Sequence, residues 1–126
     1  MPLKGYKDLI VWQKSMDLIV EVYRLVKLLP KSETYALSDQ MRRAVISIAS
    51  NIAEGKGRDS TREYARFLNI SRGSCFELET PLNACVLVEY LTEDENKKAF
   101  DILEEIGKML STMLNKLNLK IRNSNP

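Results

Sequence analysis

Four segments of the chain place apolar residues three or four positions apart, the spacing of one face of an α-helix. Short links at residues 30–37, 55–60 and about 90–92 separate them. The residues predicted to face a core are Leu9, Trp12, Met16, Ile19, Tyr23 and Val26; Leu37, Met41, Ala44, Ile48 and Ile52; Tyr64, Leu68, Ser71, Cys75, Leu78, Leu82 and Cys85; and Ala99, Leu103, Ile106, Leu110, Met113 and Leu117. The side chains expected to be mostly buried are Leu9, Trp12, Ile19, Met41, Ile48, Phe67, Leu78, Leu103, Ile106 and Leu110.

Capping and turn residues mark the ends of the predicted helices. Gly55 ends the second segment, and Ser38 is the candidate N-cap at its start. The third and fourth segments open with capping boxes, Ser60-x-x-Glu63 and Thr92-x-x-Glu95. Because short links join antiparallel neighbours, the sequence predicts an all-α, antiparallel, up-down-up-down four-helix bundle over residues 1–117. Residues 118–126 are expected to form a flexible C-terminal tail.

Pro81 lies inside the third apolar segment and allows two interpretations. A proline within a helix removes one hydrogen bond and clashes with the preceding turn. Thr80 and Pro81 would otherwise be the N-cap and first residue of a new helix. The apolar spacing runs through Pro81 unchanged, which favours one kinked helix. Gly107 lies inside the fourth segment, where the close approach of another helix is one reason for a glycine.

The composition argues against catalysis and metal binding. The chain has 126 residues, no histidine and two cysteines, so the usual general base, a Ser-His-Asp triad, the di-iron bundle motif and a four-ligand zinc site are all excluded. Cys75 and Cys85 lie about 15 Å apart along one predicted helix, too far for a disulfide. We therefore expect reduced thiols, no cofactor, no small-molecule substrate and no enzyme activity.

Hydropathy and charge indicate a cytoplasmic protein without membrane contact. No apolar run approaches the ~18 residues that span a bilayer, and no signal sequence is evident. The formal net charge is +2, which is mild for a nucleic-acid-binding protein. Residues 1–58 carry ten basic and six acidic residues, and residues 59–126 carry nine and eleven. Within the second half, residues 89–105 are acidic, whereas residues 106–126 have four basic residues and no acidic one.

Polar stripes lie beside the apolar faces of the second and third segments. They consist of Gln40, Arg43, Ser47, Asn51 and Glu54, and of Glu63, Arg66, Ile70, Gly73, Ser74 and Glu77. Folding the segments back about their link places Arg43 near Ser74 and Glu77, Ser47 near Ile70 and Gly73, and Asn51 near Arg66; an Arg43–Glu77 contact is expected. The stripes are either a solvated face with ordinary ion pairs or a polar network buried between helices or subunits. A catalytic site is disfavoured, since no nucleophile has a base.

The run Gly55-Lys56-Gly57-Arg58 resembles a phosphate-binding loop only superficially. A Walker loop needs a longer motif between a strand and a helix, and no strand is predicted here. We interpret the run as a helix–helix turn whose two cations lie beside a helix N-terminus, a position that attracts anions.

Several runs resemble one known family, the 23S rRNA intervening-sequence proteins. The signature runs are Gln40-Met41-Arg42-Arg43-Ala44, Ser47-Ile48-Ala49-Ser50-Asn51-Ile52-Ala53-Glu54-Gly55, Glu63-Tyr64-Ala65-Arg66-Phe67-Leu68, Gly73-Ser74-Cys75-Phe76-Glu77 and Leu9-Ile10-Val11-Trp12-Gln13. The resemblance covers about residues 5–117 and departs from the family pattern at Ala49, where proline is frequent, and at Pro81 and Glu89.

The resemblance implies a four-helix bundle, often a homopentamer around a central channel, with no established catalytic activity. Some members are encoded inside insertions in 23S rRNA genes and many elsewhere. A similar bundle works with a reverse transcriptase and RNA in diversity-generating retroelements. These properties are expectations for the present chain.

Two functional hypotheses follow. The first is a non-catalytic, homo-oligomeric scaffold that binds RNA or an RNA–protein complex through Arg42, Lys56, Arg58, Arg62 and the basic tail. The alternative is a purely structural or protein-interaction module with no nucleic-acid role. Self-association is expected because apolar residues outside the predicted core stripes exceed what one bundle can hide: Ile10, Val11, Val20, Val22, Leu25, Leu29, Phe76, Val86, Val88, Phe100 and Ile102. The number five rests on the resemblance alone.

Overall fold

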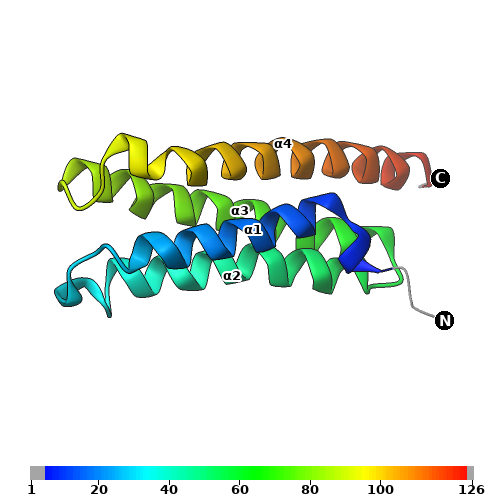
Figure 1. The fold of residues 1–126 in the computed structure, drawn as a ribbon. Helices are drawn as coiled ribbons and strands as arrows, with labels where there is room; N and C mark the ends of the chain where they lie inside the picture. Colours follow the sequence, from blue (N-terminus) through cyan, green and yellow to red (C-terminus); the bar gives the residue numbers. More distant parts are fainter. Residues whose placement is uncertain (1–4, 125–126) are drawn as a thin grey trace.

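The computed structural model describes residues 5–124. Its elements are η1 (Tyr6–Asp8), α1 (Ile10–Val26), η2 (Lys31–Glu33), α2 (Leu37–Lys56), α3 (Thr61–Leu87) and α4 (Glu93–Ser124), where η denotes a short 3-10 helix. Successive helices run in opposite directions (Figure 1). The α2–α3 link and both ends of the described chain therefore lie at one end of the bundle, and the α1–α2 and α3–α4 links lie at the other. The predicted all-α four-helix bundle is confirmed.

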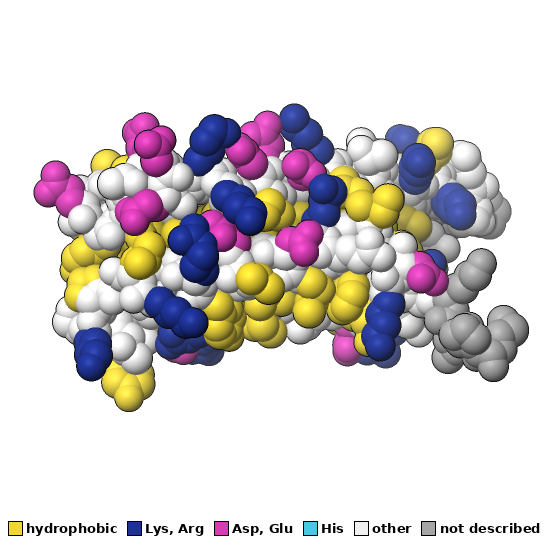
Figure 2. Space-filling model, in the orientation of Figure 1, with side chains coloured by type: hydrophobic (Ala, Val, Ile, Leu, Met, Phe, Trp, Pro, Cys, Tyr) yellow, Lys and Arg dark blue, Asp and Glu magenta, His cyan; other side chains and the backbone are white. Residues whose placement is uncertain are grey.

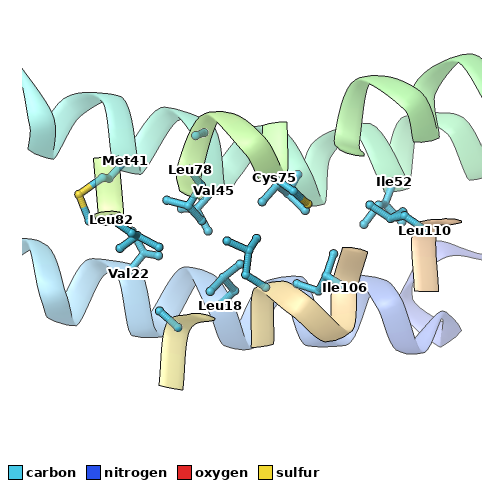
Figure 3. Close-up of a cluster of buried hydrophobic side chains, with 14 of the residues drawn as sticks. Leu18, Val22, Met41, Val45, Ile52, Cys75, Leu78, Leu82, Ile106 and Leu110 are labelled. Atoms are coloured by element: carbon cyan, nitrogen blue, oxygen red, sulfur yellow. The ribbon is translucent and has the colours of Figure 1, made fainter. Parts of the chain in front are cut away.

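The core runs along the centre of the bundle, and all four helices contribute to it (Figure 3). Among the side chains predicted to be buried, those that are buried are Met41, Ile48, Phe67, Leu78, Leu103, Ile106 and Leu110. They lie on α2, α3 and α4, so the apolar spacing identified the inner face of these three helices correctly.

The inner face of α1 differs from the predicted one. Its buried residues are Val11, Ser15, Leu18, Glu21, Val22 and Leu25. The predicted stripe is only partly buried at Leu9, Trp12, Ile19 and Val26, and it is exposed at Met16 and Tyr23. Two stripes with helical spacing exist on this segment, and the one that faces the core is the one that contains polar residues.

Both polar residues on the inner face of α1 have hydrogen-bond partners. The Ser15 hydroxyl donates to the Trp12 carbonyl oxygen at 2.6 Å. The Glu21 carboxylate accepts two hydrogen bonds from the Arg24 guanidinium, at 2.9 and 2.6 Å. Because these bonds stabilise the charged form, the pKa of Glu21 is lowered. Satisfied in this way, the two residues can occupy core positions.

The capping predictions are confirmed for α4, partly for α3 and not for α2. At α4, the Thr92 amide donates to Glu95 Oε1 at 2.8 Å and the Glu95 amide donates to Thr92 Oγ1 at 3.1 Å. At α3, the Glu63 amide donates to Ser60 Oγ at 3.0 Å. Ser38 is instead a buried residue inside α2, which η2 leads into directly, with Ala36 at the N-cap position.

The structure differs from the predictions made for two glycines, Gly55 and Gly107. α2 continues past Gly55, which lies against α3: a Cβ atom at Gly55 would lie 2.8 Å from Phe67 Cβ and 3.1 Å from Tyr64 Cδ1. Gly55 thus allows the two helices to approach closely and does not end the helix. At Gly107 a Cβ atom would meet no atom within 4 Å, so the close approach considered there does not occur.

α3 is a single helix from Thr61 to Leu87 with Pro81 inside it, as the apolar spacing favoured. Pro81 is buried, and the Thr80 hydroxyl donates to the Phe76 carbonyl oxygen at 3.2 Å in the turn before it. The interpretation of Thr80 and Pro81 as the start of a new helix is therefore wrong.

The end of α3 is closed by a left-handed residue. Glu89 has φ 65°, the Tyr90 amide donates to the Cys85 carbonyl oxygen at 2.8 Å, and the Glu89 amide donates to that of Val86 at 3.1 Å. This is the Schellman pattern, in which glycine is the preferred left-handed residue. Glu89 is one of the departures from the family pattern, and it occupies a position that is strained for an L-residue.

Replacing Glu89 with glycine is expected to raise the free energy of unfolding by about 0.5–1 kcal/mol. The left-handed conformation costs an L-residue about 1–2 kcal/mol, and the greater freedom of glycine in the unfolded chain offsets part of the gain. Urea unfolding followed by circular dichroism measures the change. Glu89→Ala keeps the strain and removes the charge, so equal stabilisation by both variants would contradict this explanation.

α4 extends to Ser124, so residues 118–124 are helical and the prediction of a flexible tail is wrong for them. The reason is that Leu117 and Ile121 are partly buried and pack against the core cluster, which continues the apolar stripe of α4 by one more turn. Residues 125–126 lie outside the described range. Among the described residues, every helix is too short or too polar to cross a lipid bilayer.

Candidate nucleic-acid interface

A small polar network joins α2 to α3. Ser47 Oγ and Ser74 Oγ are 2.7 Å apart. Asn51 Nδ2 donates to Ser47 Oγ at 3.0 Å and to the Ser47 carbonyl oxygen at 2.9 Å. The buried Ser71 hydroxyl donates to the Ile48 carbonyl oxygen at 2.9 Å. These bonds link the two helices. Those of Ser47, Asn51 and Ser74 are only partly buried, so this part of the stripes lies between the solvated face and the buried network that the sequence left open.

The register is shifted from the predicted one. Ser47 pairs with Ser74 rather than lying between Ile70 and Gly73. Arg66 Nε donates to Glu63 Oε2 at 3.0 Å, and Asn51 Nδ2 donates to Ser47, so each side chain has a partner on its own helix. Among the described residues, no hydrogen bond joins Asn51 to Arg66.

In the described part of the chain, no ion pair joins Arg43 to Glu77, the two residues predicted to be in contact. Arg43 Nη1 donates to Asp39 Oδ2 at 3.4 Å, one turn earlier on α2. Arg43 and Glu77 nevertheless line the same open cavity, together with Gln40 and Ser47. The two charged groups lie on facing helices as expected, but a partner four residues away on the same helix needs less ordering of the side chain than a partner across helices.

The α2–α3 turn gathers three of the four candidate nucleic-acid contacts. Lys56 ends α2, Arg58 lies in the link and Arg62 lies in the first turn of α3. All three are exposed. The polar-stripe residue Glu54 also lies here, where it pairs with Arg58 at 3.1 Å and takes no part in the Ser47–Ser74 network.

Aromatic rings hold the cations of this turn in place. The Arg58 and Arg66 guanidinium carbons lie 5.0 and 4.6 Å from the centre of the Phe67 ring. Lys56 Nζ lies 5.8 Å from the centre of the Tyr64 ring. Each distance is within the range of a cation–π interaction. Sequence reasoning did not include Arg66 among the cations, although its spacing of four from Arg62 places both on one side of α3.

Arg42 does not belong to this group. It lies about 20 Å from Lys56 along α2, and its Nη2 donates to the Thr34 carbonyl oxygen at 3.2 Å. Arg42 therefore holds the η2 segment against α2 and is only partly exposed.

The C-terminal part of α4 adds cations at the end of the bundle that holds the α2–α3 turn (Figure 1). Lys116, Lys120 and Arg122 are exposed there. We call this end, with Lys56, Arg58, Arg62, Arg66, Lys116, Lys120 and Arg122, the cationic end. Exposed cations in such an arrangement attract anions. The described residues contain no group of three or more His, Cys, Asp or Glu suited to a metal.

The two cysteines are free and buried. Burial raises the pKa of the Cys75 thiol to about 12, so the thiol stays protonated at neutral pH and is a poor nucleophile.

An apolar face between α1 and α2 is the other prominent surface. It contains the outer residues of α1 that the sequence placed in the core, next to residues of α2: Trp12, Met16, Ile19, Ile46, Ala49 and Ala53 line a shallow groove with Tyr6. Met16 and Ile46 are exposed. Figure 2 shows apolar side chains along this side of the bundle. We call these residues the α1–α2 face.

The chain is similar to known proteins in sequence and in fold. The family model described as 23S rRNA-intervening sequence protein matches residues 7–112. The chain is also similar to a solved structure from Bacteroides thetaiotaomicron VPI-5482, a protein of unknown function from the S23 ribosomal protein family. The two share 27% sequence identity with a TM-score of 0.78, over 83% of this chain and 98% of that chain. No curated protein matches the chain.

Proposed function

Because this chain belongs to the family of 23S rRNA-intervening sequence proteins, we propose that it is a non-catalytic, self-associating protein that binds structured RNA through its cationic end. The observation that carries the proposal is the position of the cations: the α2–α3 turn and the end of α4 are far apart in sequence and lie at the same end of the bundle (Figure 1).

The distribution of charge supports this choice of surface. Residues 106–126 have four basic residues and no acidic one, and among the described residues no carboxylate pairs with Lys116 or Lys120. The opposite end carries Glu89, Glu93 and Asp94 and would repel a phosphate backbone. A modest net charge of +2 is thus compatible with local attraction at one end, since exposed charges act over about one Debye length.

We expect the protein to bind a structured RNA with an affinity that falls as salt rises, by a slope of about 0.7–0.9 per phosphate contact. Replacing both Lys116 and Lys120 with glutamine should weaken binding about tenfold at low salt and reduce the slope by about two. The change is measured by fluorescence anisotropy with a labelled RNA hairpin over a salt series.

The matched control is Lys97→Gln with Lys98→Gln, which removes the same charge at the opposite end. An equal loss in both double variants would show that net charge, and not the cationic end, governs binding. Undetectable RNA binding at low salt would favour the alternative, a structural or protein-interaction module. The carboxylates interleaved with the cations, such as Glu54 and Glu63, are the observation that favours this alternative.

The α1–α2 face is the surface we assign to self-association. Met16 and Ile46 are exposed apolar side chains, and Trp12 and Ile19 are only partly buried beside them. Tyr23, also exposed, lies further along α1 and lines a second cavity with Ile46. A contiguous apolar face of this kind is usually covered by a partner. We propose a second copy of the chain as the partner and, from the family resemblance, a homopentamer as the assembly.

Replacing both Met16 and Ile46 with lysine should raise the protein concentration at which the assembly dissociates at least tenfold, because charges placed in a dry contact cannot keep their hydration. Light scattering and native mass spectrometry report the mass against the 14.4 kDa of one chain. Phe76→Lys, on an exposed apolar residue of α3, is the control. Dissociation by the control alone would place the contact on α3, and a monomeric wild-type protein would end the proposal.

A further inference from the structure

Four exposed apolar side chains lie on the two links opposite the cationic end. They are Leu28 and Tyr35, between α1 and α2, and Leu87 and Val88, where α3 ends. Tyr35 is 93% exposed, Leu87 83%, Val88 54% and Leu28 47%. We call these four residues the apolar tip. The α1–α2 face lies along the side of the bundle, so self-association through that face leaves the apolar tip unexplained.

A hydrogen bond and shared core contacts hold the two links together. The Tyr90 hydroxyl donates to Glu33 Oε2 at 3.1 Å, which ties the α3–α4 link to η2. Beneath them, Leu29 from one link and Leu91 from the other are both buried in the core cluster. The left-handed Glu89 and its Schellman bonds fix the path of the chain directly after Leu87 and Val88. The backbone of the α3–α4 link is thus held in one path, which lowers the ordering cost of binding to that of the exposed side chains themselves.

The charges around the apolar tip indicate the partner. Residues 89–95 contain four acidic residues and no basic one, and Glu89, Glu93 and Asp94 are exposed. Figure 2 shows acidic side chains beside apolar ones at this end of the bundle. On the other link, Lys27 and Lys31 are the charged neighbours. Negative charge therefore borders Leu87 and Val88 on the α3–α4 side only.

We propose that the apolar tip docks a cationic amphipathic segment of a protein partner. The apolar side chains of the segment pack on Leu87, Val88 and Tyr35, and its lysines or arginines lie over Glu89, Glu93 and Asp94. Phosphate-rich partners are repelled by these carboxylates, which distinguishes the apolar tip from the cationic end. The inference does not depend on RNA binding. If both surfaces are used, the bundle connects a nucleic acid at one end to a basic protein at the other.

The probe is a synthetic helical peptide of about 14 residues, with leucines three or four positions apart on one face and lysines at the other positions. It is titrated into the isotopically labelled full-length protein, and amide shifts are followed by NMR. We expect the largest shifts at residues 28–35 and 86–95. A leucine–glutamate peptide and a serine–lysine peptide should each bind at least tenfold more weakly. The first carries negative charge in place of positive charge, and the second has no apolar side chains to pack on the apolar tip.

Variants locate the contact. Leu87→Ser with Val88→Ser should weaken peptide binding at least tenfold, and Glu93→Gln with Asp94→Asn should reduce its salt dependence. Leu119→Ser, an exposed leucine at the cationic end, should change neither. All these side chains are exposed, and circular dichroism checks that each variant folds.

Three results would overturn the proposal. Shifts that map away from the apolar tip would place the site elsewhere, and equal binding of the leucine–glutamate peptide would remove the role of the carboxylates. A lower assembly mass of the Leu87→Ser, Val88→Ser variant would show that the apolar tip contacts another copy of the chain. RNA affinity should be unchanged in this variant, so failure here is distinguishable from failure of the RNA proposal.

Discussion

Replacing Ile48 with alanine is expected to lower the free energy of unfolding by about 2–5 kcal/mol. The Ile48 side chain is fully buried at 0% exposure, so its loss removes apolar contacts and leaves a cavity. The backbone at this position cannot move far to fill that cavity, because the Ile48 carbonyl oxygen accepts the hydrogen bond from Ser71. Urea unfolding followed by circular dichroism gives the change directly.

The matched control is Ile70→Ala, the same substitution on an isoleucine that is 41% exposed on α3. It should cost less than about 1 kcal/mol, since little buried area is lost and alanine favours a helix. A loss below about 1 kcal/mol at Ile48 would show that this position is not part of a tightly packed core.

Replacing Gly55 with alanine should destabilise the protein by about 2 kcal/mol. Alanine would normally stabilise a helix interior by about 1 kcal/mol relative to glycine. Here the new Cβ atom would lie 2.8 Å from Phe67 Cβ, an atom close to the backbone that no change of rotamer can move. α2 and α3 must separate to accept it, which weakens the pair of helices with the most extensive contact in the bundle.

The same substitution at Gly107 separates the effect of helix propensity from that of the steric clash. No atom lies within 4 Å of a Cβ atom there, so Gly107→Ala should stabilise the protein by about 0.5–1 kcal/mol. Opposite signs at the two glycines in thermal or urea unfolding would confirm that the α2–α3 approach requires Gly55. Stabilisation at both would show that the helices separate without cost.

The sequence predicted the fold well where apolar spacing and capping agreed. In α2, α3 and α4 most apolar residues fall on one stripe and the other faces are largely polar, so the apolar spacing indicates a single inner face for each helix. In α1 almost every face carries apolar residues, and the stripe that faces the core contains Ser15 and Glu21. The partners of these two residues lie on the same helix, but periodicity counts polarity alone and therefore favoured the outer stripe with Trp12.

For the candidate site, the sequence identified several of the residues involved but not how they pair in space. Of the predicted stripes, Ser47, Asn51 and Ser74 take part in hydrogen bonds at the α2–α3 contact. The register depends on the conformation of a four-residue link, and one turn of error moves every partner. Long charged side chains also form ion pairs with a nearby opposite charge on the same helix, as Arg43 does with Asp39 instead of Glu77. The grouping of the α4 cations with the α2–α3 turn follows from α4 being a helix through Ser124, where a flexible tail was expected.

The order of the helices also bears on how the chain reaches this structure. Among the α-helices of the described residues, each packs against the next one in sequence, and α1 also pairs with α4; η1 contacts α2 as well. Most native contacts can therefore form by closing short loops, a topology associated with folding in microseconds to milliseconds. The Ser47–Ser74 and Ile48–Ser71 contacts lie on the hairpin of α2 and α3, and we therefore expect this hairpin to form early in folding.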